Sequence, residues 1–200
     1  MIWSQALLVI TTLLAILYLT FYTEKNLEWI KTPLIISLAA FALYLTLPLF
    51  LHLDNPVYGW LSVISTTLLF VSISALIREL KPLYNRYPVG FSLFPLLILI
   101  VYPFISDQEV LRQLLIQILQ GGGLLIGLLI VITLLKPVEN SIWVLTGIIL
   151  IAVSYGIYWF IMDLYSLDDW IWQVILAGGL LFSMYYINNI FTYLKQNHFL

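Results

Sequence analysis

Cysteine is absent from this chain of 200 residues, and charge is scarce, with 8 Lys and Arg, 10 Asp and Glu and 2 His. The lack of cysteine excludes disulfides, thiolate nucleophiles and cysteine metal sites. Two histidines are too few ligands for a zinc site. The net charge of −2, without any basic cluster, predicts no binding to nucleic acid. We therefore expect no metal and no cofactor.

Hydrophobic residues make up 62% of the chain and charged residues only 9%, whereas a soluble domain is roughly a quarter charged. Such a chain must cover its surface with lipid. We predict an all-α integral membrane protein, a compact bundle of seven transmembrane helices in one polytopic domain, 1–200. The N-terminus, MIWSQALLVI, lacks a basic n-region and indicates a first spanning helix, not a cleaved signal peptide. The predicted helices are 2–22, 33–53, 57–78, 89–105, 108–135, 141–164 and 168–194.

Capping residues and prolines mark the breaks between these segments. Two are a capping residue before a proline, and two fit the S-x-x-D/E capping box. They are Thr32-Pro33, Asn55-Pro56, Ser106 with Glu109, and Ser166 with Asp169. Pro48, Pro95 and Pro103 should kink helices two and four.

The basic residues predict the orientation, because cytoplasmic loops attract Lys and Arg. With the N-terminus outside and the C-terminus cytoplasmic, one basic residue, Arg112, lies outside. The other seven fall on the cytoplasmic side of a plasma (inner) membrane: Lys25, Lys31, Arg78, Lys81, Arg86, Lys136 and Lys195.

Polar residues follow one face of the fifth helix. Glu109, Gln113, Gln117 and Gln120 are spaced 4, 4 and 3 residues apart, so they form a stripe about 16 Å long. An amide that faces lipid is unsatisfied, and we therefore expect the stripe to face the bundle. Two interpretations stay open: hydrogen bonds between helices, or the wall of a polar cavity that opens outward.

Small residues predict close helix packing. Gly123 and Gly127 form a small-x-x-x-small pair, and Gly179 with Ser183 on the seventh helix offers a matching surface. The glycines could instead kink the fifth helix and expose carbonyl groups to a cavity.

An acidic cluster lies at the outer turn between helices six and seven. Asp163, Asp168 and Asp169 could bind a cation or act as acid and base. The alternative is helix capping in a solvated loop.

The segment NSIWVLTGIILIAVSYGIYWF, residues 140–160, resembles a stretch of the YhhN-type lysoplasmalogenase family. In members of that family, a tryptophan precedes a glycine at the start of an apolar helix, and Ser-Asp follows. Lys31-Thr-Pro33 is similar to the family's Lys-Pro. The resemblance implies a bundle usually described with eight helices and hydrolysis of a vinyl-ether lysolipid. In this chain Ser154-Tyr155 stands in place of Ser-Asp, and the family's earlier Gly-Asp has no counterpart.

These patterns leave three functions open. The first is a non-catalytic subunit or scaffold of a membrane complex, with a membrane-protein partner or a second copy of the chain. The second is a small transporter or channel lined by the glutamine stripe. The third is a YhhN-like lysolipid hydrolase.

Overall fold

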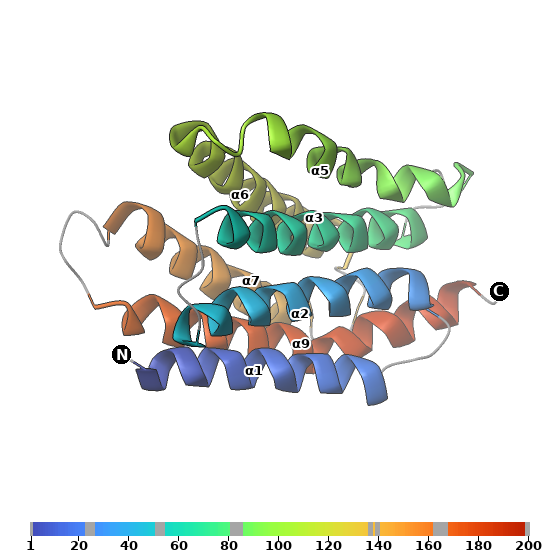
Figure 1. Cartoon of the computed structure of the whole chain (residues 1–200). Coiled ribbons are helices and arrows are strands. Elements are labelled where there is room, and N and C mark those ends of the chain that lie inside the picture. The colour runs from blue at the N-terminus through green and yellow to red at the C-terminus, as the bar shows by residue number, and fades with distance from the viewer. Residues whose placement is uncertain are drawn as a thin grey trace. The chain divides into compact units, whose positions relative to one another are not determined.

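The computed structural model describes residues 2–22, 27–50, 55–80, 86–135, 138, 141–161 and 168–198. Within these ranges every regular element is a helix, which confirms the all-α prediction. The elements are α1 (Ile2–Phe21), α2 (Glu28–Phe50), α3 (Asn55–Leu80), η2 (Val89–Leu96), α5 (Leu97–Val101), η3 (Tyr102–Phe104), α6 (Glu109–Thr133), α7 (Ser141–Gly156), η4 (Ile157–Ile161) and α9 (Trp170–His198) (Figure 1).

Six helical stretches among the described residues are long and apolar enough to cross a membrane. They are α1, α2, α3, α6, α7 with its π-helical extension η4, and α9. A seventh apolar stretch, Val89–Phe104, is shorter. The chain therefore has the helices of a multi-pass membrane protein, at positions close to those that the hydropathy predicts.

The short stretch owes its form to two prolines. Eight residues of η2 and three of η3 are 3₁₀-helical, and α5 lies between them. Pro95 lies in η2 and Pro103 in η3, and each lacks the N–H that an α-helical bond requires. A 3₁₀-helix rises about 2.0 Å per residue against about 1.5 Å in an α-helix, so the whole stretch is about 30 Å long. That length equals the thickness of a bilayer's hydrocarbon core.

Two predicted caps are wrong. α2 begins at Glu28, so Pro33 lies inside the helix and Thr32 does not cap it. α6 begins at Glu109, where the N–H of Arg112 donates to the carbonyl of Gln108 over 2.9 Å. The Ser106 hydroxyl is used by the preceding turn, since it donates to the carbonyl of Pro103 over 3.0 Å.

The break before the last helix also differs from a capping box. Asp169 directly precedes α9, and its carbonyl accepts the N–H of Gln173 over 3.4 Å. Asp169 therefore lies at the cap position and not three residues into the helix. Ser166, its predicted partner, lies outside the described residues.

The chain divides into two compact units. The first comprises Met1–Glu24 and Leu124–Leu200, and the second comprises Lys25–Gly123. The division falls within α6, directly after its run of glycines. The prediction of a single domain, 1–200, stays a prediction.

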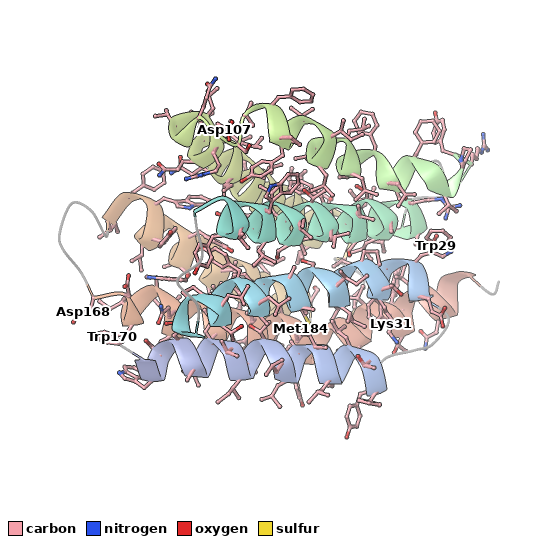
Figure 2. All side chains as sticks on the ribbon, in the orientation of Figure 1. Trp29, Lys31, Asp107, Asp168, Trp170 and Met184 are labelled. Carbon is pink, nitrogen blue, oxygen red and sulfur yellow. The ribbon has the colours of Figure 1, made fainter. Side chains whose placement is uncertain are left out.

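In the first unit α9 packs against both α1 and α7 (Figure 1). α1 and α9 are parallel, because Trp3 contacts Trp170 at their beginnings, with ring centroids 5.9 Å apart, and Tyr18 and Tyr185 line one groove farther along. Figure 2 shows Trp170 at the start of α9 and Met184 farther along the helix. α7 is antiparallel to α9, since Trp143 stacks on Tyr186.

Glycines set the distance between α7 and α9. A Cβ atom added at Gly147 would lie 2.8 Å from the backbone nitrogen of Ser183 and 2.9 Å from the carbonyl oxygen of Gly179. One added at Gly179 would lie 2.9 Å from the carbonyl oxygen of Gly147 and 3.0 Å from the nitrogen of Ile151. Both helices thus present backbone at this crossing, as small-residue interfaces in membranes do.

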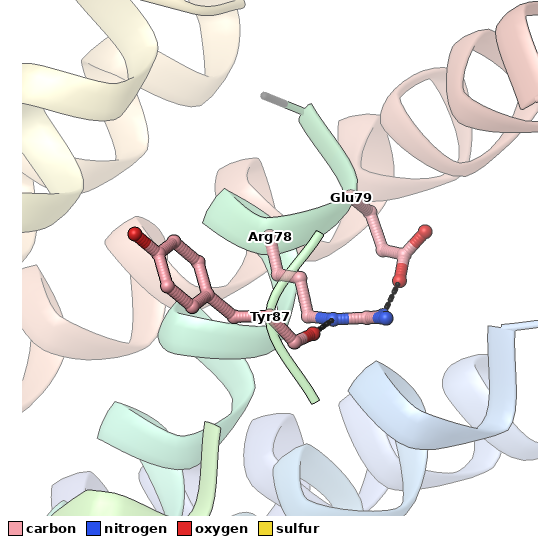
Figure 3. Close-up of polar contacts among 3 residues, drawn as sticks. All are labelled: Arg78, Glu79 and Tyr87. Atoms are coloured by element: carbon pink, nitrogen blue, oxygen red, sulfur yellow. Dashed lines mark hydrogen bonds and ion pairs between the residues drawn. The ribbon is translucent and has the colours of Figure 1, made fainter. Parts of the chain in front are cut away.

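In the second unit α2 and α3 are antiparallel, and the Ser37 hydroxyl donates to the carbonyl of Ser65 over 2.7 Å. α3 is also antiparallel to the 3₁₀ stretch that follows it. At one end, Arg78 Nε donates to the carbonyl of Tyr87 over 3.4 Å while its Nη1 pairs with Glu79 at 2.6 Å (Figure 3). At the other end, Trp60 packs edge-on against Tyr102, with centroids 4.6 Å apart.

We predict that Gly179→Ala destabilises the protein by about 1–3 kcal/mol, because the added methyl meets backbone that cannot rotate away. Gly178→Ala is the matched control, since nothing lies within 4 Å of its Cβ position. Unfolding by sodium dodecyl sulfate in mixed micelles measures both. Equal midpoints for the two variants would contradict the close approach.

Candidate functional site

The glutamines of α6 do not share one environment. Gln113 and Gln117 are exposed, whereas Gln120 is half-buried, and its buried Oε1 has no hydrogen-bond partner in the part of the chain that the structure describes. The side chain of Glu109 lies outside the described residues. Gln113 and Gln117 therefore differ from Gln120 in exposure, and the polar cavity lined by the stripe stays a prediction.

The packing of α6 explains why Gln120 is half-buried while Gln113 and Gln117 are exposed. Leu119 and Gly123 lie on its buried face, and Gly123 faces the ring of Phe70 on α3. The opposite face is open, with Ile118 61% and Leu125 65% exposed. Gln120 is one residue from Leu119 and turns toward the buried face. Gln113 and Gln117 share a line on the open face, because residues four apart lie above one another on a helix.

Gln117 lies deep in the span. The apolar stretch Val110–Thr133 is 24 residues long, and its middle falls between residues 121 and 122. At about 1.5 Å per residue, Gln117 lies about 7 Å from that middle, well inside a hydrocarbon core about 30 Å thick. Gln113 lies about 13 Å from the middle, near the edge of the core.

Three glycines of α6 lie at ordinary distances from the described side chains around them. Cβ atoms added at Gly122 and Gly123 would lie 3.7 and 3.5 Å from the ring of Phe70, and one at Gly127 would lie 3.7 Å from Ile148. These are ordinary contact distances. Among the described residues no backbone lies close to Gly123 or Gly127, whereas Gly179 and Ser183 meet Gly147 of α7.

A glutamine outside the predicted stripe, not singled out from the sequence, bonds to another helix. Gln173 of α9 is 7% exposed, and its Oε1 accepts the hydroxyl of Ser4 on α1 over 2.6 Å. The two residues are 169 positions apart. Only the polarity of each within an apolar span hinted at a partner.

A second polar group lies buried in the second unit. Tyr102 is fully buried, and its hydroxyl has no hydrogen-bond partner among the described residues. Gly59 leaves room for that hydroxyl, since a Cβ atom there would collide with it. The Arg112 side chain reaches the same place, with its Cδ 3.2 Å from the Cβ position of Gly59.

The acidic cluster is only partly described. Asp163 lies outside the described residues, and Asp168 and Asp169 are exposed. Asp169 Oδ1 accepts the indole N–H of Trp172 over 3.4 Å. Within the described ranges no three His, Cys, Asp or Glu residues gather as metal ligands would.

Lys31 departs from its expected place in a cytoplasmic loop. It is the fourth residue of α2 and only 7% exposed. The early start of α2, at Glu28, brings this cation into the folded chain.

Comparison with protein-family models, with curated proteins and with solved structures finds no match for this chain. The resemblance of residues 140–160 to the YhhN-type family stays a prediction.

We predict that Gln173→Leu and Ser4→Ala each destabilise the protein, because each leaves the other buried polar group unpaired. Hydrogen bonds between membrane helices are worth about 0.6 kcal/mol, up to about 1.7. A double-mutant cycle measured by unfolding in micelles should give a coupling energy in that range. Strict additivity of the two effects would show that the bond contributes nothing.

Proposed function

We propose that this chain is a non-catalytic subunit or scaffold of a membrane complex, and that it binds its partner through the open face of α6. The observation that carries this proposal is the exposure of Gln117 at a depth where only hydrocarbon would otherwise surround it. An unpaired amide in hydrocarbon costs several kcal/mol, whereas a helix that presents a donor or acceptor satisfies it.

The shape of the face supports a helix as the occupant. Gly121 lies one helical turn beyond Gln117, on the same line, and is followed by Leu125. An amide beside a small residue lets a second backbone come close enough for a hydrogen bond. Gln113 extends the same line toward the membrane surface, where a partner can also contact it.

We further propose that the chain crosses a plasma (inner) membrane seven times. The parallel packing of α1 and α9 supports this count. Two parallel helices require an odd number of crossings between them. Among the described residues, four long apolar stretches lie between α1 and α9: α2, α3, α6 and α7 with η4. Val89–Phe104 is the fifth crossing, and its length of about 30 Å suits that role.

The distribution of Lys and Arg supports an N-terminus outside and a C-terminus in the cytoplasm. Arg78 and Arg86 lie at one end of the second unit, and Arg112 lies at the other with Gly59. Lys31, which is buried in the fold, contributes less to this bias than its sequence position implies.

A transporter or channel would need a cavity lined by the glutamine stripe. Because Gln113 and Gln117 are exposed, a cavity lined by them would have to be completed by another chain. The hydrolase hypothesis rests on the YhhN-type resemblance and on Asp163. Incubation of the purified protein with lysoplasmalogen, followed by assay for released aldehyde, tests it directly.

We predict that Gln117→Leu reduces the recovery of the partner, or of a second copy, roughly tenfold in mild detergent, as expected for the loss of about 1.4 kcal/mol. Gln120→Leu is the matched control, because that side chain turns toward the buried face. The measurement is quantitative mass spectrometry of the purified complex. Unchanged recovery with Gln117→Leu, or an equal loss with Gln120→Leu, would argue against the α6 face as the binding surface.

The chain lacks cysteine, so a single cysteine can report on its topology. We predict that a cysteine appended at the N-terminus of the protein in intact cells reacts with a membrane-impermeant maleimide, and that one at the C-terminus reacts only after lysis. If both ends react on the same side, the seven-crossing topology is refuted.

A further inference from the structure

An open groove runs between α1 and α9 and does not involve the α6 face. Its volume is 720 Å³. Ala15, 4% exposed, and Met184, 8% exposed, form its floor, and Leu14, Leu181 and Phe182 form part of its walls. Met184 is labelled in Figure 2, on α9.

A small side chain creates this groove. Leu8, Thr12, Ala15 and Leu19 form the buried line of α1. Thr12 and Leu19 precede and follow Ala15 on this line, and Ala15 contributes only a single methyl group to the floor. The flexible Met184 lies opposite on α9 and leaves the hollow open to the side.

The groove has a polar end. Tyr18 stacks on Tyr22 at 5.9 Å, and Tyr185 packs edge-on against Tyr186 at 4.8 Å; all four line the groove. Tyr22 directly follows the last residue of α1, where the helix leaves the apolar region. Tyrosines are enriched at this level of a membrane because their hydroxyls reach water and headgroups.

The length of the groove matches an acyl chain within one leaflet. From Leu14 to Tyr22 it extends about 12 Å at about 1.5 Å per residue. One leaflet of hydrocarbon is about 15 Å deep, and a transmembrane helix needs the full core of about 30 Å. An acyl chain that enters from one membrane surface needs only the depth of one leaflet.

We propose that this groove is a binding site for a glycerophospholipid of the leaflet on the C-terminal side of the chain. One acyl chain lies over Ala15 and Met184. The hydroxyls of Tyr22 and Tyr185, both well exposed, donate hydrogen bonds to the ester or phosphate oxygens of the lipid. The site retains one lipid where the rest of the surface exchanges lipid freely.

The test uses the full chain in vesicles of phosphatidylethanolamine and phosphatidylglycerol. These include a phosphatidylethanolamine that carries a diazirine in the middle of one acyl chain. After irradiation, mass spectrometry should find the label concentrated on Leu14–Tyr22 and Leu181–Tyr186. Ala15→Phe fills the floor and should reduce this labelling about tenfold, the effect of some two lost buried methylenes. Ile10→Phe, an exposed position of α1 outside the groove, is the control.

Labelling spread evenly over the exposed helix faces, or unchanged by Ala15→Phe, would overturn the proposal. So would a cross-linked dimer through these segments, which would make a second copy the occupant. Should Ala15→Phe fail to fold, Tyr22→Phe with Tyr185→Phe replaces it, read out as the phospholipid that stays bound through delipidation in detergent. Retention should fall severalfold, and equal retention would reject the polar end of the site.

Discussion

The lack of water in hydrocarbon is the constraint on which this structure depends, because every polar group there must find a partner in protein. The helices pair the N–H and C=O groups of the backbone with one another. Hydroxyls bond to their own helix, as Thr12 does to the carbonyl of Leu8 over 2.7 Å, or to a neighbour, as Ser154 does to the carbonyl of Trp172 over 2.8 Å. Within this pattern Gln117 stands apart, since it is a deep amide on an open face. This amide is the group through which we propose that another chain binds.

Small residues act in two ways in this chain, and position in the sequence does not distinguish them. Gly147 and Gly179 lie at a crossing where any Cβ atom would meet backbone. Gly122 and Gly123 lie at ordinary distance from Phe70, so their own chain does not require glycine there. A run of glycines lowers helix stability by about 1 kcal/mol per residue relative to alanine. Among the described residues, no close approach of backbone at Gly122 or Gly123 offsets that cost.

The sequence predicts the type and approximate limits of the apolar segments, because hydropathy, proline and capping residues act locally. The sequence does not predict which face of α6 turns inward. In a membrane, leucine is equally favourable against lipid and against protein, so the position of apolar residues does not indicate the buried face. The Ser4–Gln173 bond joins residues 169 positions apart, and no local signal relates them. A helix that begins at Pro33 would leave Lys31 in a loop, but α2 begins at Glu28 and accommodates that proline in its second turn.

The α6 face and the groove between α1 and α9 place different demands on an occupant. On α6 an amide lies about 7 Å from the middle of the span, at a depth where acyl chains offer no donor or acceptor. In the groove the hydroxyls lie only toward the end near Tyr22, at the level of headgroups, and the deeper part is aliphatic. A phospholipid has the same division, with oxygens at one end and hydrocarbon at the other. A protein helix therefore suits the first surface and a lipid the second, because polarity at each depth, and not total hydrophobicity, decides what binds.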